Sequence, residues 1–291
     1  MASKCAIILL IFVSLNALVC CNADSFLLSG NVLIGGSSLR NKDYVFTMQR
    51  DCNLVLYDRG NPIWVTSTGG LASNCYCYLG NDGNLMIKTL VDAKVIWSSK
   101  TQEKGKHIGN YALVLQKDRN VVMYGPAIWA TAINAASAMS ITKVMNINVT
   151  DNIALSKKNE TDNVLVSGSS LSTGSTLQIK DYVLIMQEDC NLVIYDRGQP
   201  IWATNTGGLA RNCICYLGND GNLMVRTSFG GRIIWSSNTR RSDISRYVLV
   251  LQRDRNLVIY GPAIDASNTN LPSHGMSITK AMKINESSTS V

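Results

Sequence analysis

A nine-residue pattern, Gln-x-Asp-x-Asn-x-Val-x-Tyr, occurs four times in this chain and limits its possible folds more than any other feature. The copies span residues 49–57, 116–124, 187–195 and 252–260. In an extended strand alternate side chains point to opposite faces, so the five conserved positions of the pattern would share one face. In the first copy Cys52, Leu54 and Leu56 would then form the core face. Four complete copies therefore predict repeated β-structure with a functional face.

The chain is also a tandem duplication, because residues 44–97 match residues 182–235. Each half has a third, degenerate copy of the pattern, at 80–88 and 218–226, in which Gly replaces Gln, Met replaces Val, and Lys or Arg replaces Tyr. Gly-Asn and Asp-Gly turns separate short alternating segments, which predicts antiparallel sheet. Five of the six copies are followed by a tryptophan: Trp64, Trp97, Trp129, Trp202 and Trp235. Three such units per half predict an all-β fold with three small sheets around a pseudo-threefold axis and tryptophans at the centre.

The length of 291 residues suggests about two domains. Lys4 precedes an apolar run, and Cys21 and Ala23 are small residues before a possible cleavage point, so residues 1–23 are predicted to be a secretory signal peptide. No other apolar run approaches the ~20 residues of a membrane span, so we expect a soluble, secreted protein. The predicted division is a signal peptide at 1–23, a first domain at 24–137, a linker at 138–163, a second domain at 164–266 and a tail at 267–291.

The cysteines follow the duplication. Cys52 and Cys75 recur with the same spacing as Cys190 and Cys213, and in a secreted protein each pair is predicted to form a disulfide. Cys77 and Cys215 are expected to be buried thiols, either free or joined between chains. A zinc site is improbable because the chain has only two histidines, and no metal or other cofactor is predicted. The glycosylation sequons lie in the linker and tail, at Asn148, Asn159 and Asn285.

The residue types of the pattern suit a sugar. A carboxylate such as Asp51 accepts strong hydrogen bonds from hydroxyls, while Gln49, Asn53 and Tyr57 can both donate and accept, and Val55 can contact ring carbons. A glycosidase needs two carboxylates across the bond, and each complete copy offers one on this face. Ser and Cys nucleophiles lack a plausible histidine partner, so the chain is not expected to be an enzyme. The net charge of +7 is spread without a basic stripe, which excludes a nucleic-acid partner.

With these residues in view, the chain resembles the monocot mannose-binding lectins, the bulb-type family that includes snowdrop agglutinin. Phe26 to Gly30, Ile63-Trp64 and Tyr124 to Thr131 are also similar to that family. The resemblance implies a β-prism II fold in each half, with three four-stranded sheets. It also implies that Asp and Asn bind the axial 2-hydroxyl of mannose, Gln the 3-hydroxyl and Tyr the 4-hydroxyl, with Val against the ring. The implied mannose-binding residues are Gln49, Asp51, Asn53, Val55, Tyr57, Gln116, Asp118, Asn120, Val122, Tyr124, Gln187, Asp189, Asn191, Val193, Tyr195, Gln252, Asp254, Asn256, Val258 and Tyr260.

Two departures from the family pattern matter. The central copies keep Asp82 with Asn84 and Asp220 with Asn222, but turn residues explain these at least as well as sugar binding, so both sites are expected to be lost. Asp265 stands where a sixth tryptophan is expected. Family dimers exchange a C-terminal strand carrying that tryptophan, so this departure puts subunit pairing through the second half in question; a homo-oligomer or pairing of the two domains within one chain is expected.

The leading interpretation is a secreted plant lectin that binds terminal mannose on glycans at several weak sites, with a defence or storage role implied by the resemblance. The alternative is a lectin-related storage or protein-interaction protein that keeps the fold and binds sugar poorly. Loops around Lys104 to His107 or Arg240-Arg241 decide between them if they block the sites.

Overall fold

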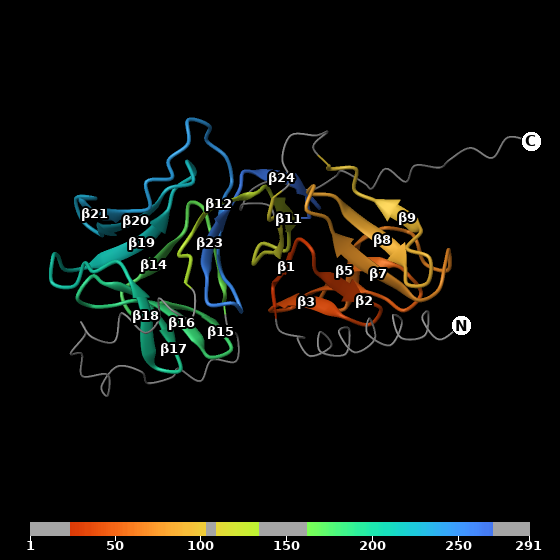
Figure 1. Ribbon diagram of the computed structural model, residues 1–291, viewed down its shortest axis with the longest axis horizontal. Coiled ribbons are helices and arrows are strands. Elements are labelled where there is room, and N and C mark those ends of the chain that lie inside the picture. The colour runs from red at the N-terminus through yellow and green to blue at the C-terminus, as the bar shows by residue number, and fades with distance from the viewer. Residues whose placement is uncertain (1–23, 103–108, 134–161, 270–291) are drawn as a thin grey trace, which may run out of the picture.

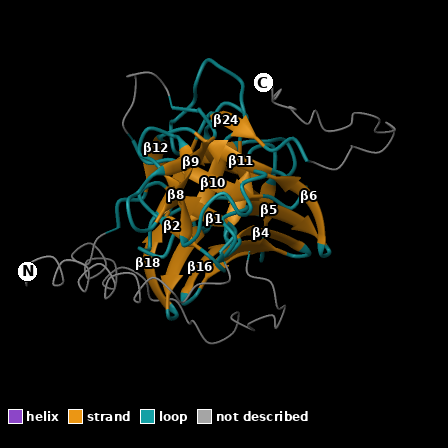
Figure 2. Ribbon diagram, turned by 90° about the vertical axis from the view of Figure 1, so that its right-hand side faces the viewer, coloured by secondary structure: helices purple, strands orange, loops and turns teal. Residues whose placement is uncertain are grey.

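The computed structural model describes residues 24–102, 109–133 and 162–269. Within these ranges the secondary structure consists of strands joined by turns and loops, as Figure 2 shows. No helix in this part of the chain is long and apolar enough to cross a membrane. The predicted signal peptide, most of the linker and tail, the loop at 103–108 and the three sequon asparagines lie outside the described residues.

The strands form six four-stranded antiparallel sheets, three for each half. In domain 1 the first two sheets are β3-β4-β5-β6 (Ser38–Asn41, Tyr44–Met48, Leu54–Asp58, Asn61–Val65) and β2-β7-β8-β9 (Val32–Ile34, Cys75–Leu79, Leu85–Thr89, Val95–Ser98). In domain 2 their counterparts are β15-β16-β17-β18 (Thr176–Ile179, Tyr182–Met186, Leu192–Asp196, Gln199–Ala203) and β14-β19-β20-β21 (Ser170–Ser172, Cys213–Leu217, Leu223–Thr227, Ile233–Ser236).

The third sheet of each domain takes its last strand from the other half of the chain. In domain 1 the order is β1-β10-β11-β24 (Phe26–Leu28, Ala112–Leu115, Val121–Tyr124, Ala263–Ala266). In domain 2 it is β13-β22-β23-β12 (Val164–Val166, Val248–Leu251, Leu257–Tyr260, Ala127–Ala130). Figure 1 shows the crossing, with β24 beside β11 in one lobe and β12 beside β23 in the other. The strand exchange of family dimers therefore occurs here within a single chain, despite Asp265.

The inner faces of the sheets form the domain cores, as the alternation of apolar residues predicts. Along β10 and β11, Leu113, Leu115, Val121 and Met123 belong to the buried cluster of domain 1. In domain 2 the three tryptophans Trp129, Trp202 and Trp235 contact one another at the centre. Trp129 reaches that centre because its strand, β12, has crossed over from the first half.

The outer faces of the two exchanged sheets meet between the domains. Val122 and Tyr124 on β11 lie in one buried cluster with Val258 and Tyr260 on β23, although the two strands belong to different domains. This interface buries the outer face of each sheet, which in an ordinary antiparallel sheet would be solvated. An edge of the same interface holds the ion pair between Asp24 and Arg253, whose Oδ2 and Nε atoms are 2.6 Å apart.

The interface is nearly symmetric, as pairing of two similar domains requires. The counterpart of the Asp24–Arg253 pair is an ion pair between Asp162 and Lys117. Between them the Ser25 hydroxyl donates a hydrogen bond to Asn163 Oδ1, at 2.7 Å. The structure thus contains the intramolecular pairing that was one of the two expected arrangements.

Both predicted disulfides are present, Cys52–Cys75 and Cys190–Cys213. Cys77 and Cys215 are free and buried, as expected. Burial without a charged partner raises the pKa of both thiols, that of Cys215 to about 12, so neither is a ready nucleophile.

The predicted fold class, two tandem β-prism II domains of three four-stranded sheets each, is confirmed. The predicted boundaries at 137–138 and 163–164 fall within or beside residues that the structure leaves undescribed. They stay a prediction. Strand exchange also means that β12 and β24 each complete the domain opposite to their own half.

Candidate functional site

The pattern is a turn followed by a strand, and the expectation of one extended strand through all nine residues is wrong. In the first copy β4 ends at Met48 and β5 begins at Leu54, so residues 49–53 connect them. Two backbone hydrogen bonds close this turn. The Gln49 amide donates to the Asn53 carbonyl at 2.8 Å, and the Cys52 amide donates to the Gln49 carbonyl at 3.2 Å. Cys52 has a φ of 75°, a left-handed conformation that no regular strand contains.

The aspartate of every copy builds this turn with one of its oxygens. In each of the six copies Asp Oδ1 accepts a hydrogen bond from the backbone amide of the Asn two residues on, at 2.9–3.1 Å. This is the local hydrogen bond that makes Asp a common turn residue. The interpretation of Asp and Asn as turn residues therefore applies to all six copies, and the aspartate alone does not mark a sugar site.

The asparagine fastens the next strand to the turn. In the first copy Asn53 Oδ1 accepts from the Thr66 hydroxyl at 3.1 Å and from the Thr68 amide at 3.2 Å. Asn191 makes the same bonds with Thr204 and Thr206. Because the carbonyl oxygen is used inside the protein, only the amide nitrogen of these asparagines is left to donate to a ligand. The hydroxyl residues are part of the site's support, and sequence reasoning missed them.

In the exchanged sheets this support comes from the opposite half. Ser267, just after β24, donates to Asn120 Oδ1 at 2.8 Å, and the Ile133 amide, after β12, donates to Asn256 Oδ1 at 2.8 Å. The copies at 116–124 and 252–260 are thus completed only by strand exchange.

The side chains of glutamine and tyrosine contact each other in the four complete copies because the turn folds the two ends of the pattern together; one continuous strand would have held them far apart. The Gln49 side-chain nitrogen donates to the Tyr57 hydroxyl at 2.7 Å, and Gln187 donates to Tyr195 at 2.9 Å. Gln252 and Tyr260 make the same bond at 2.6 Å, as do Gln116 and Tyr124. The bond leaves the glutamine oxygen as an acceptor and the tyrosine proton as a donor, which matches the paired needs of neighbouring sugar hydroxyls.

The four copies differ in how much of this pair is accessible. Gln49 and Gln187 are partly exposed, whereas Gln116 and Gln252 are 6% and 5% exposed. Tyr57 is partly exposed, Tyr195 and Tyr260 are buried, and Tyr124 is 0% exposed at the domain interface. Burial raises the pKa of Tyr124 above its usual range and that of Tyr260 to about 12, because the phenolate would lose its hydration. The copies at 49–57 and 187–195 are therefore the open motifs, and those at 116–124 and 252–260 are the interface motifs.

The valines lie below the polar groups in all four complete copies. Val55, Val122, Val193 and Val258 are at most 5% exposed. The aspartates Asp51, Asp118, Asp189 and Asp254 are all exposed. Each complete copy therefore has a carboxylate at its rim, and the two interface motifs keep that rim open while their tyrosines are covered.

The central motifs are closed by their own side chains. A Cβ atom on Gly80 or Gly218 would lie 2.3 Å from Oδ1 of Asp82 or Asp220, so the carboxylate occupies the space in which a glutamine would begin. Lys88 lies over the Tyr78 ring, and Arg226 over the Tyr216 ring, instead of supplying a phenol.

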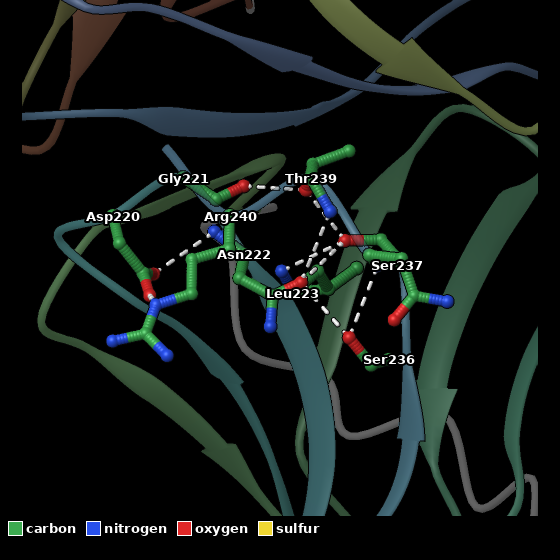
Figure 3. Close-up of polar contacts among 9 residues, drawn as sticks. Asp220, Gly221, Asn222, Leu223, Ser236, Ser237, Thr239 and Arg240 are labelled. Atoms are coloured by element: carbon green, nitrogen blue, oxygen red, sulfur yellow. Dashed lines mark hydrogen bonds and ion pairs between the residues drawn. The ribbon is translucent and has the colours of Figure 1, made fainter. Parts of the chain in front are cut away.

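Figure 3 shows the central motif of domain 2, where the side-chain oxygens of Asp220 and Asn222 have protein partners. Arg240 pairs with Asp220, with 3.2 Å between Nε and Oδ2. Asn222 Oδ1 accepts from the hydroxyls of Ser236 and Ser237, at 2.9 and 3.2 Å. The Thr239 hydroxyl donates to the Gly221 carbonyl at 2.7 Å. Two loops were expected to decide whether sugar sites are blocked. In the loop with Arg240-Arg241, Arg240 pairs with the central motif, and the loop at 104–107 lies outside the described residues.

Two buried polar atoms at the complete copies lack a protein partner within the described residues. They are Asn120 Nδ2 and Gln187 Oε1. Buried polar atoms nearly always have a partner, so unpaired ones point to a ligand or water. One is a donor and the other an acceptor, in the roles that the pattern assigns to Asn and Gln.

A glycine beside each open motif was also missed. A Cβ on Gly69 would lie 3.0 Å from Asp51 Oδ2, and one on Gly207 would lie 2.7 Å from Asp189 Oδ2. These contacts are tight for a methyl group, so glycine keeps the outer carboxylate oxygen clear for a ligand. The Thr-Gly-Gly-Leu segment that follows both open motifs was the available sequence signal.

The described residues contain no group of three or more His, Cys, Asp and Glu side chains that could hold a metal ion. The site therefore consists of neutral amides, a phenol, hydroxyls and one carboxylate. This set can bind a polyhydroxyl compound through hydrogen bonds, and it offers no general base paired with a nucleophile.

No protein-family model matches the chain. Known proteins nevertheless resemble it over most of its length. It is 37% identical over 245 residues to mannose-specific lectin 2 of Colocasia esculenta, covering 82% of this chain and 84% of that protein. It is 33% identical over 248 residues to mannose-specific lectin 2 of Crocus vernus, covering 83% and 86%. Among solved structures, the two-domain, fetuin-binding agglutinin of Scilla campanulata matches with a TM-score of 0.70 and 35% identity, covering 84% of this chain and all of that one.

The fold and the motifs together define a two-domain β-prism II protein with sugar-binding-type turns on its sheets. The identity and coverage then give the family. This chain belongs to the monocot mannose-binding lectins, as a two-domain member.

Proposed function

We propose that the protein is a lectin that binds terminal mannose residues of glycans without chemical change. The observation that carries this is the Gln–Tyr hydrogen bond beside an exposed aspartate, present in all four complete copies and absent from the two central ones. The relatives' names, mannose-specific lectins, agree with the sugar that the residues suit.

In each open motif the outer aspartate oxygen and the asparagine amide nitrogen would bind the axial 2-hydroxyl. Asp51 and Asn53 have these atoms available because Oδ1 of each is used within the turn. Gln49 Oε1 would accept from the 3-hydroxyl, and the Tyr57 hydroxyl would donate to the 4-hydroxyl. Gln187, Asp189, Asn191 and Tyr195 would take the same roles in domain 2.

The interface motifs are proposed to bind mannose more weakly. Asp118 and Asp254 are exposed, so the carboxylate can still meet a hydroxyl. Gln116 and Gln252 are buried, whereas Gln49 and Gln187 are partly exposed, and a glutamine that cannot reach the ligand removes one of the hydrogen bonds. The chain would therefore have four mannose sites of unequal affinity.

The open motifs lie in different domains of one chain, which suits a branched glycan with several mannose ends. Weak sites that engage together gain avidity through effective concentration. We further propose that the chain is secreted after loss of residues 1–23 and glycosylated at Asn148, Asn159 and Asn285. The two disulfides, which persist in oxidising compartments, support the secretory route.

Calorimetric titration with methyl α-mannoside tests the proposal, with methyl α-glucoside as control because the two differ only at the 2-hydroxyl. We expect mannoside binding at two stronger sites per chain and little binding of glucoside. Equal affinity for both sugars would contradict the assigned role of Asp and Asn. Absence of mannoside binding would favour the alternative, a lectin-related protein that has kept the fold.

A further inference from the structure

The centre of domain 2 is filled by three aromatic side chains. Trp129, Trp202 and Trp235 contact one another edge to face, with ring centroids 6.1, 6.2 and 5.9 Å apart. This spacing is typical of favourable aromatic pairs. Each tryptophan comes from a different sheet, so the triad joins all three sheets of the domain.

The centre of domain 1 has only two of these side chains. Trp64 and Trp97 are 6.1 Å apart in the same edge-on arrangement. The third position belongs to Asp265, which β24 places opposite Met123, as β12 places Trp129 opposite Ile259 in domain 2. Strand exchange has therefore brought a short carboxylate to the place of a bicyclic ring.

A cavity of about 270 Å³ occupies this place. Among the described residues, its lining combines apolar side chains with three serines, and Asp265 is the one charged residue in it. The apolar side chains include Phe46, Trp64, Trp97, Leu113 and Met123. An apolar cavity of ~150 Å³ is large enough to bind benzene, so this one can accept a larger ring system. In domain 2 the corresponding space is taken by the Trp129 side chain.

The lining combines two features that together select a ligand class. Two indole rings provide faces and edges for an aromatic ring and attract a positive charge placed over them. The Asp265 carboxylate is exposed, and no hydrogen bond or ion pair joins it to another described residue. A carboxylate in this position favours a donor, above all an ammonium group.

We propose that this cavity, the Trp64–Trp97 cavity, binds a small aromatic amine. The ring packs against both Trp64 and Trp97 in the place of the missing tryptophan, and the ammonium group binds the Asp265 carboxylate. The site is separate from the mannose motifs and does not rest on the proposed lectin function. It is specific to domain 1, because Trp129 fills the centre of domain 2.

Three ligands of one ring size and different charge test the proposal by calorimetric titration of the full chain. Tryptamine is cationic, indole is neutral and indole-3-acetate is anionic at neutral pH. We expect one tryptamine per chain, indole binding at least tenfold more weakly, and indole-3-acetate weaker still. Equal binding of tryptamine and indole-3-acetate, or no tryptamine binding, would overturn the proposal.

Two substitutions separate the charge from the space. Asp265→Asn keeps the cavity and removes the charge, so tryptamine should lose at least tenfold in affinity while indole is little changed. Asp265→Trp should abolish binding of both by filling the cavity. Asp243→Asn, an exposed position away from the cavity, is the matched control for net charge and should change nothing. Unchanged tryptamine binding in Asp265→Asn would contradict the assignment, even if Asp265→Trp failed to fold.

Discussion

The open motif at 49–57 and the central motif at 80–88 share one turn, yet only the first leaves room for a sugar. Both turns use Asp Oδ1 to accept the Asn amide, at 2.9 and 3.0 Å, and both place a left-handed residue between them, with φ of 75° at Cys52 and at Gly83. Both asparagines are held by hydroxyls of the following strand. The turn is thus conserved where the site is not.

The difference lies in the residues that begin and end the pattern. In the open motif Gln49 donates a hydrogen bond to Tyr57, and the pair keeps an acceptor and a donor for a ligand. In the central motif Gly80 has no side chain, and the Asp82 carboxylate occupies the space where one would begin. Lys88 lies over the Tyr78 ring. Asp and Asn build the fold, and Gln and Tyr make it a binding site. Variants that change one set of residues in both kinds of motif can test this separation.

The largest expected effect concerns the disulfide, which is present in the open motif and absent from the central one. Replacing Cys52 and Cys75 by Ser should lower the free energy of unfolding by about 3 kcal/mol, because the open chain regains loop entropy. Mannoside affinity should stay within about twofold, since the central motif keeps the same turn without a bridge. Urea unfolding and calorimetry measure the two effects. Lost binding in a folded variant would show that the bridge shapes the site.

The second-largest effect concerns the asparagine, which stabilises the turn in both kinds of motif and binds sugar only in the open one. Asn191→Ala and Asn222→Ala should each cost about 1–3 kcal/mol of stability by leaving hydroxyls and an amide without an acceptor. Only Asn191→Ala should also remove mannoside binding, at the domain 2 open motif. If Asn222→Ala lowered the number of sugar sites, the central motif would not be closed.

A smaller effect distinguishes the open motif from the interface motif. Tyr57→Phe removes the hydroxyl that accepts from Gln49, and should weaken its own site by about 1 kcal/mol. Tyr124→Phe is the matched control, because that phenol is fully buried and should not touch the ligand. Site-resolved titration by NMR compares the two. A larger binding loss for Tyr124→Phe would mean that the interface opens in solution.

The smallest effect at neutral pH involves the interface tyrosines. Burial raises the pKa of Tyr260 to about 12 in the folded protein, from about 10 in an unfolded chain. Tyr260 therefore stays protonated to higher pH in the folded state than in the unfolded chain. Its contribution to the free energy of unfolding is full below pH about 10 and is lost as the pH rises towards 12. Urea midpoints should fall between pH about 10 and 12, and Tyr260→Phe should reduce that fall. Identical pH dependence in both proteins would contradict this origin.

Much of the fold could be predicted from the sequence because its signals are local and repeated. Alternating strands, turn residues and the two cysteine spacings gave the sheets and the disulfides, and the tryptophan spacing predicted the core of domain 2. The turn at 49–53 was predicted wrongly, because Cys52 carries no sign of a positive φ. The glycines at the equivalent central position, Gly83 and Gly221, were the available signal.

Strand exchange and its consequences could not be predicted in the same way. β24 would complete a sheet in either domain by its own pattern, and only three-dimensional packing decides which. The burial of Tyr124 depends on that packing as well, so four motifs that look alike in sequence differ in access. The covered phenols, the hydroxyl supports from the opposite half and the cavity beside Asp265 all follow from this exchange.

Gln and Tyr, and not the shared Asp–Asn turn, separate working sites from closed ones. The most direct measurement is calorimetric titration with methyl α-mannoside of two matched double variants, Asp51→Asn with Asp189→Asn, and Asp82→Asn with Asp220→Asn. The first pair should weaken both open sites by about 1.5–3 kcal/mol each, the worth of a hydrogen bond to a charged group, and so remove useful binding. The second pair should bind as the unmodified protein does. Loss of sites in the second pair with binding retained in the first would contradict the account.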